Sequence, residues 1–171
     1  MVPFKRFTGF TFLQLLITLS IITILLLVGL PNLTSVVQSN RLKSAVHLFY
    51  SNMQFARAEA IRGGDDVYVN FNAGTNWRYG INKSSSCNCM VANSCMMDGI
   101  EKVVTSSDFP SVSMSISGFV GNLQFERMRG ILVGNGGTIT FSLGSKSIQV
   151  QINSLGRMRI CSDTVGGFKP C

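Results

Sequence analysis

The feature that most constrains this chain is a long segment without charge near its N-terminus. No Asp, Glu, Lys or Arg occurs from Phe7 to Asn40, and Leu, Ile, Phe and Val dominate the run from Phe10 to Leu30. A helix that spans a bilayer needs about 20 consecutive apolar residues. The sequence therefore predicts a single transmembrane helix over 10–30.

Two basic residues, Lys5 and Arg6, precede this segment. By the positive-inside rule they hold the N-terminal end in the cytoplasm and send the rest of the chain across the membrane. A secretory signal peptide has the same order of regions. However, the apolar run here is longer than an h-region of about 7 to 15 residues, and no small-x-small cleavage site follows it. An uncleaved anchor is the other alternative.

Beyond the predicted span, residues 31–62 have the pattern of an amphipathic helix. Apolar residues recur at alternating steps of four and three, the spacing of one helical stripe. The members of the stripe are Leu42, Val46, Phe49, Met53, Ala56 and Ala60. We interpret it as the helix side of a domain core. Pro31 is expected to kink this helix, because it lacks an N–H, and Gly63-Gly64 to end it.

From residue 63 to 171 the period of the pattern changes to two. Apolar and polar residues alternate in short segments separated by clusters of Gly, Asn and Ser. The predicted strands are Asp66–Phe71, Asn76–Ile81, Val112–Ser117, Leu123–Arg127, Gly137–Leu143, Ser147–Ile152 and Arg157–Cys161. We therefore predict an α+β fold, in which the long helix packs on an antiparallel sheet and 63–171 forms a β-rich extracytoplasmic domain.

The N-terminal residues also resemble a known family. Lys5-Arg6 followed by Gly9-Phe10 and Gln14 resembles the leader and first turn of type IV pilins and type II secretion pseudopilins. The resemblance implies that 1–9 is a prepilin leader, that a prepilin peptidase cuts after Gly9 and methylates Phe10, and that the helix contacts other pilins. The domain would then be periplasmic before assembly into a pilus at the cell surface.

Two further segments narrow the resemblance. Ala56 to Arg62 and Leu155 to Cys161 resemble the minor-pilin branch called FimT/GspH. Gln14 departs from the family, which usually has Glu there to pair with the methylated amino terminus of a neighbouring subunit. Glutamine costs less to insert into a membrane but gives up that ionic attraction. This departure favours a minor subunit over the main fibre.

The last third of the chain is basic. Val112 to Cys171 holds six Lys or Arg against two Asp or Glu, whereas Gly63 to Ser111 holds three against five. In the last predicted strand Arg157 and Arg159 share one face, about 6.8 Å apart. That spacing suits neighbouring phosphates of a nucleic acid, and guanidinium groups bind phosphate in a bidentate manner. The alternative is a solvated strand edge that is protected by charge.

The resemblance favours the phosphate-binding interpretation. Gly156-Arg157-Met158-Arg159 resembles the Gly-Arg-x-Arg motif by which FimT-type minor pilins contact DNA in natural transformation. It implies binding of double-stranded DNA through the phosphate backbone, with little sequence preference and a steep salt dependence. Weaker candidates from the same basic third are Lys146, Lys169, Arg127 and Arg129.

Five cysteines in a domain outside the cytoplasm predict disulfides. Cys161 and Cys171 would close a short loop, a pairing that resembles the C-terminal loop of related pilins and would also hold the arginine strand. Of the remaining three, Cys95 is expected to pair with Cys87 or Cys89, which leaves one thiol. The alternative is a metal site formed by these three cysteines. A fourth nearby His or Cys is missing from the sequence, so no metal is expected.

The sequence gives no grounds for expecting an enzyme or a cofactor. The only histidine, His47, lies in the amphipathic helix, and no nucleophile, base or phosphate-cradling loop can be assembled with it. Two functions from different classes remain besides pilus priming. One is a minor pilin that binds DNA for uptake, and the other is a GspH-like pseudopilin, a structural subunit of a secretion piston without a DNA ligand.

Overall fold

The computed structural model describes residues 11–119 and 121–171, and for residues 28–33 it describes the helical backbone alone. The chain separates into two compact units, Met1–Val37 and Gln38–Cys171. The predicted cleavage site, Gly9 and Phe10, lies outside the described residues, and the predicted span 10–30 is covered only in part. The Pro31 side chain is also outside them, so its kink stays a prediction.

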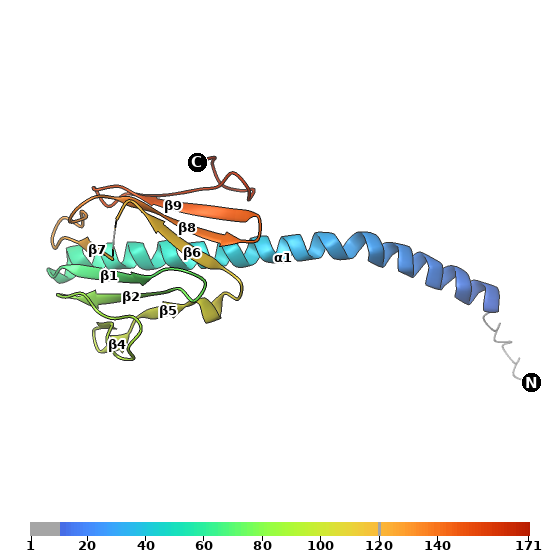
Figure 1. The fold of residues 1–171 in the computed structure, drawn as a ribbon, viewed down its shortest axis with the longest axis horizontal. Coiled ribbons are helices and arrows are strands. Elements are labelled where there is room, and N and C mark those ends of the chain that lie inside the picture. Colours follow the sequence, from blue (N-terminus) through green and yellow to red (C-terminus); the bar gives the residue numbers. More distant parts are fainter. Residues whose placement is uncertain (1–10, 120) are drawn as a thin grey trace, which may run out of the picture. The chain divides into compact units, whose positions relative to one another are not determined.

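One helix, α1, runs from Phe12 to Gly63 (Figure 1). Thr11 precedes it as an N-cap, because its hydroxyl accepts a hydrogen bond from the Gln14 backbone N–H at 3.4 Å. Gly64 follows the helix with a φ of 71°, so the predicted glycine stop is confirmed. In the part of the chain that the structure describes, none of the helical segments is both apolar enough and long enough to span a membrane.

Short antiparallel strands and one 3₁₀ helix follow α1. Their bounds are β1 Val67–Asn72, β2 Arg78–Lys83, β3 Met96–Met97, β4 Ile100–Glu101, β5 Val103–Thr105, η1 Ser106–Asp108, β6 Ser113–Ser117, β7 Asn122–Phe125, β8 Gly137–Leu143, β9 Lys146–Ile152 and β10 Met158–Cys161. One sheet has the strand order β5-β2-β1-β7, a second has the order β10-β9-β8-β6, and β3 pairs with β4 alone.

All seven predicted strands are present, and β8 has the predicted bounds. The sequence did not predict β3, β4 and β5. These strands have two or three residues each, too few for an alternating pattern to emerge. The α+β fold with a long N-terminal helix on antiparallel sheets is confirmed.

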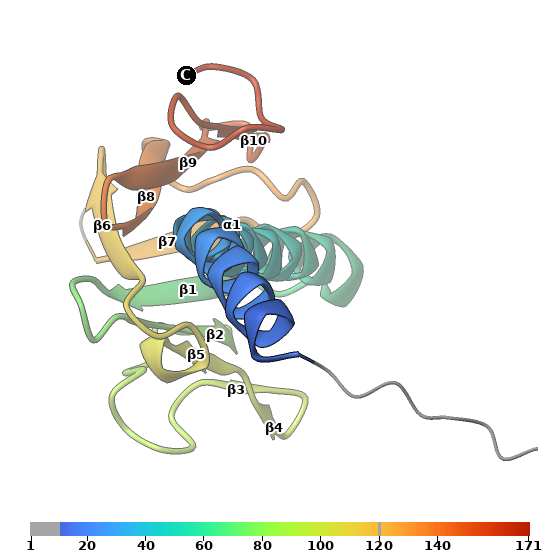
Figure 2. The same cartoon turned by 90° about the vertical axis from the view of Figure 1, so that its right-hand side faces the viewer.

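The core of the Gln38–Cys171 unit lies between α1 and the two sheets, which flank the helix in Figure 2. All six members of the predicted helical stripe are fully buried. The inward faces of β8 and β9 are also confirmed, since Ile139, Phe141 and Ile148 are buried. Trp77 is buried among these side chains, and its indole N–H donates to the Val112 carbonyl oxygen at 2.8 Å. The amphipathic part of α1 is thus an integral part of this unit.

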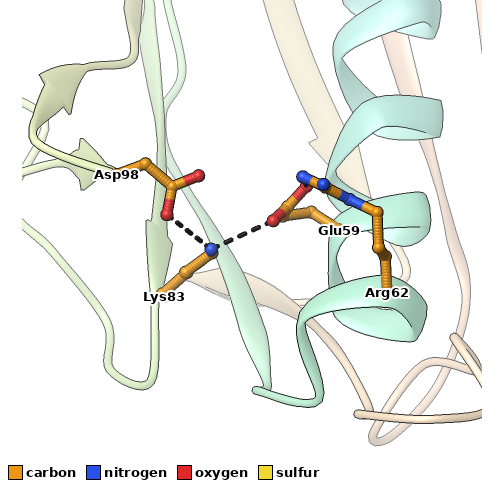
Figure 3. A network of polar contacts seen from close by, with 4 residues as sticks. All are labelled: Glu59, Arg62, Lys83 and Asp98. Atoms are coloured by element: carbon orange, nitrogen blue, oxygen red, sulfur yellow. Dashed lines mark hydrogen bonds and ion pairs between the residues drawn. The ribbon is translucent and has the colours of Figure 1, made fainter.

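A charged network joins the end of α1 to β2 (Figure 3). Glu59 is only 4% exposed and accepts from Arg62 at 2.7 Å and from Lys83 at 3.0 Å. Lys83 also contacts Asp98 at 2.7 Å. The hydrogen bonds from Arg62 and Lys83 hold the pKa of Glu59 below its ordinary value of 4.5. The buried carboxylate therefore stays ionised and fixes the last turn of α1 to the sheet.

Candidate nucleic-acid interface

The two arginines of the Gly-Arg-x-Arg segment lie at the edge of a sheet. β10 is the edge strand beside β9, and Arg157 directly precedes it. Arg157 and Arg159 are exposed, whereas Met158 and Ile160 are half-buried and pack against the core. The predicted alternation is confirmed, and both guanidinium groups belong to the outer side of the strand.

Gly156 fixes the approach of the chain to β10. Its φ is 71°, and a Cβ at this position would lie 2.5 Å from the Gly130 carbonyl oxygen. Arg57 of α1 holds the two segments together, because its Nε donates to Gly130 O at 2.9 Å and its Nη2 to Leu155 O at 3.4 Å. Only glycine satisfies both the left-handed backbone and the close approach. The helix thus positions the turn that delivers Arg157.

An open groove lies beside the arginines on the outer face of β8 and β9. Arg159 is opposite Gln151 of β9, and Gln151 is opposite Thr138 of β8, so the three form a cross-strand row. The groove has a volume of about 560 Å³ and is also lined by Asn153 and Arg157. Guanidinium, amide and hydroxyl donors gather on one concave surface, which suits an anionic ligand.

The predicted disulfide between Cys161 and Cys171 is present and closes a loop beside β10. Lys169 forms a parallel bridge with Cys161, which lays the end of the loop against the strand. Arg159 Nη2 donates to the Pro170 carbonyl oxygen at 3.2 Å. The loop therefore holds Arg159 from one side and brings the exposed Lys169 next to it.

Two weaker candidates have contacts outside β10. Lys146 begins β9, about 17 Å along the strand from Gln151. Because side chains alternate between the two faces of a strand, Lys146 lies on the same face as the core residues of β9. Its Nζ donates to the hydroxyl of Ser39 of α1 at 2.6 Å. Arg127 lies after β7, where its backbone N–H donates to the Asp66 carboxylate at 2.9 Å.

Three cations of the described residues form ion pairs, and none of them belongs to the Gly-Arg-x-Arg segment. Arg129 contacts Glu126 at 2.7 Å, and Arg62 and Lys83 belong to the Glu59 network. Within residues 11–119 and 121–171, no Asp or Glu side chain forms an ion pair with Arg157, Arg159 or Lys169. Arg159 Nη2 also donates to the Cys171 main-chain oxygen at 3.5 Å. The positive charge of the β10 edge is therefore not balanced by an acidic side chain in these segments.

The sequence did not identify one cation beside the same loop, Lys43 of α1. Its Nζ lies 5.8 Å from the centre of the Phe168 ring. His47, one turn further along α1, has its ring 5.9 Å from the same phenyl group. Local sequence patterns do not predict contacts between segments that are so far apart in the chain.

The other three cysteines lie in the loop between β2 and β3. Cys87 and Cys95 form a disulfide, in agreement with one of the two predicted pairings, and Cys89 is a free, buried thiol. Burial raises the pKa of Cys89, which keeps it protonated. The described residues contain no cluster of His, Cys, Asp and Glu suited to a metal ion.

The chain is similar to one known family and to several solved structures. The model of the family described as "Type II transport protein GspH" matches residues 45–156. A type IV minor pilin of Pseudomonas aeruginosa, FimU, is 19% identical over 70% of this chain and 91% of its own, with a TM-score of 0.53. The minor pseudopilin EpsH from the type 2 secretion system of Vibrio cholerae is 15% identical over 71% and 97%, with a TM-score of 0.53.

At these identities the solved structures establish the fold alone. No curated protein matches the chain. The family model, by contrast, covers well over half of the residues, including the buried part of α1 and most of both sheets. The chain therefore belongs to the GspH family and is a minor pilin or pseudopilin of the GspH type.

Proposed function

We propose that this minor pilin binds double-stranded DNA through the phosphate backbone and takes part in DNA uptake during natural transformation. The observation that carries the proposal is the exposed pair Arg157 and Arg159 at a sheet edge, which forms no ion pair with an Asp or Glu side chain among the described residues. The family match ends at residue 156. The arginine pair is thus supported by its geometry and by the Gly-Arg-x-Arg resemblance.

The spacing of the pair accounts for the mode of binding that we propose. Residues two apart on a strand are separated by about 6.8 Å, close to the distance between successive phosphates of one backbone. Each guanidinium can form two parallel hydrogen bonds to a phosphate. The half-buried Phe168 packs against α1, so among residues 11–119 and 121–171 we identify no exposed ring beside the pair that supports base stacking. Binding is expected to be insensitive to sequence and sensitive to salt.

The proposal includes a path to the cell surface. Prepilin peptidase would cut after Gly9 and methylate Phe10, and α1 would hold the protein as a single-pass inner-membrane subunit with a periplasmic domain. The apolar side chains exposed on α1 from Phe12 to Leu27 support a role of this segment in the bilayer and against other pilins. No catalytic step is proposed for the chain.

The direct test is the double variant Arg157→Gln/Arg159→Gln of the full chain in detergent. We expect the Kd for a fluorescein-labelled duplex to rise at least about tenfold at low salt, and the slope of log K against log salt to fall by about 1.8, for two lost phosphate contacts. Fluorescence anisotropy at several salt concentrations measures both quantities.

The control Arg78→Gln/Lys102→Gln removes the same net charge from the sheet that does not contain β10, because Arg78 begins β2 and Lys102 precedes β5. It is expected to leave both quantities unchanged. Equal losses in the two double variants would mean that net charge, and not this edge, attracts DNA. A structural pseudopilin without a DNA ligand is the second candidate, favoured by the match to a type II transport family. It predicts that the wild-type chain does not bind the duplex.

A further inference from the structure

We infer that Lys43 of α1 belongs to the same DNA-binding surface and contacts a phosphate of its own. This inference rests on the proposed function of Arg157 and Arg159. The observation behind it is that the disulfide-closed loop 161–171 joins the arginine strand on one side to α1 on the other. The cations of three separate chain segments therefore meet at one loop.

The contacts of the loop place Lys43 at this surface. The ammonium group of Lys43 lies 5.8 Å from the centre of the Phe168 ring, and a Cβ on Gly167 would lie 3.5 Å from it. The next residue, Lys169, is exposed and bridges to β10, and Pro170 accepts a hydrogen bond from Arg159 at 3.2 Å. A short run of loop residues thus contacts Lys43 at one end and Arg159 at the other.

The charge of Lys43 is available for a ligand. In the described residues no salt bridge involves Lys43, and its ammonium retains its hydrogen-bond donors above the ring face. The one acidic side chain of the loop, that of Asp163, accepts from the Cys171 backbone N–H at 3.0 Å and is held within the loop. The Phe168 ring limits the freedom of the lysine, which lowers the entropy cost of contact with a phosphate.

This arrangement extends the site beyond a single strand edge. Arg157 and Arg159 lie along β10, whereas Lys43 comes from a helix on the other side of the loop. A duplex carries one phosphate charge per about 1.7 Å of its axis. A third cation that lies to one side of the line through Arg157 and Arg159 can therefore contact a phosphate of the same DNA strand or of the opposite strand. Phe168 acts as a positioning residue, because it touches Lys43 and not the ligand.

The test compares Lys43→Gln with Lys102→Gln in the full chain in detergent. Lys102 is a matched control, because its Nζ lies 5.7 Å from the centre of the Phe55 ring in the same kind of contact, but remote from β10 in sequence and sheet. Anisotropy with a labelled duplex is recorded between about 50 and 200 mM salt. We expect Lys43→Gln to raise the Kd about threefold and to lower the salt slope by about 0.9, with Lys102→Gln unchanged and Lys43→Arg close to wild type.

The outcomes separate the two proposals. If Lys43→Gln binds with the wild-type Kd and slope while Arg157→Gln/Arg159→Gln is impaired, the inference is overturned and the proposed function stands. An equal loss in Lys43→Gln and Lys102→Gln also overturns it, since the effect would then be one of net charge. Absence of duplex binding by the wild-type chain removes the proposed function and the inference with it. Circular dichroism melting of each variant verifies the fold.

Discussion

Replacing Gly156 by alanine is expected to lower the free energy of unfolding by about 3 kcal/mol and to weaken duplex binding with it. Two costs add. A residue with a Cβ is strained at the φ of 71°, and the new Cβ would lie 2.5 Å from the Gly130 carbonyl oxygen. The turn would have to move away from Arg57, and Arg157 would move with it. Urea unfolding and duplex anisotropy of the full chain in detergent measure the two effects.

Gly144 offers a control that separates strain from collision. Its φ is 60°, but no atom lies within 4 Å of the position that a Cβ would occupy. Gly144→Ala is therefore expected to cost only about 1 kcal/mol and to leave DNA binding intact. If Gly144→Ala and Gly156→Ala are equally destabilising, the contact between Gly156 and Gly130 does not constrain the arginine turn.

Glu59→Gln is the second substitution with a large expected effect. It leaves the side-chain volume unchanged but removes a buried charge that accepts hydrogen bonds from Arg62 and Lys83. We expect a loss of about 2 kcal/mol in the free energy of unfolding. Asp98→Asn removes the other carboxylate on Lys83, but Asp98 is 62% exposed, so a change within about 0.5 kcal/mol is expected.

The pH dependence of this effect follows from the direction of the pKa shift. The pKa of Glu59 is lower in the folded chain than its ordinary value of 4.5, because Arg62 and Lys83 bind the ionised form. Its contribution is therefore fully present above pH 4.5 and is lost as the pH falls through the lower folded value. The stability difference between wild type and Glu59→Gln should shrink on acidification. A difference that stays constant from neutral pH into this acid range would contradict the network.

Much of the fold could be predicted because most of its helices and strands have a clear pattern of apolar residues in their own sequence. The apolar residues of the stripe from Leu42 to Ala60 share one face only if the segment is a helix, and all of them are in the core. The alternation in β8 fixed both its bounds and its inward face. The short strands β3 to β5 have no such alternating pattern. They are strands because they pair with neighbouring strands, and their own residues do not indicate this.

The candidate site was predictable in part for the same reason. A period of two placed Arg157 and Arg159 on one face, and the edge position of β10 exposes them. The same period, applied to β9, puts Lys146 on the face of its core residues, so the sequence held the information that separates Lys146 from the arginines.

The supporting contacts could not be predicted, because they join distant segments. Arg57 donates to Gly130, which is 73 residues away in the chain. Lys43 contacts Phe168 because the loop that Cys161 and Cys171 close lies against α1. Such contacts depend on the relative placement of elements, which no local period encodes.

A transformation assay in the native host tests whether the β10 edge serves DNA uptake. Strains carrying Arg157→Gln/Arg159→Gln, Arg78→Gln/Lys102→Gln or a deletion are compared for transformation frequency, with piliation and protein secretion measured in parallel. We predict that the first variant transforms as poorly as the deletion while piliation and secretion remain normal, and that the second transforms as wild type does. If the Arg157→Gln/Arg159→Gln strain transforms at the wild-type frequency, the β10 edge does not serve DNA uptake.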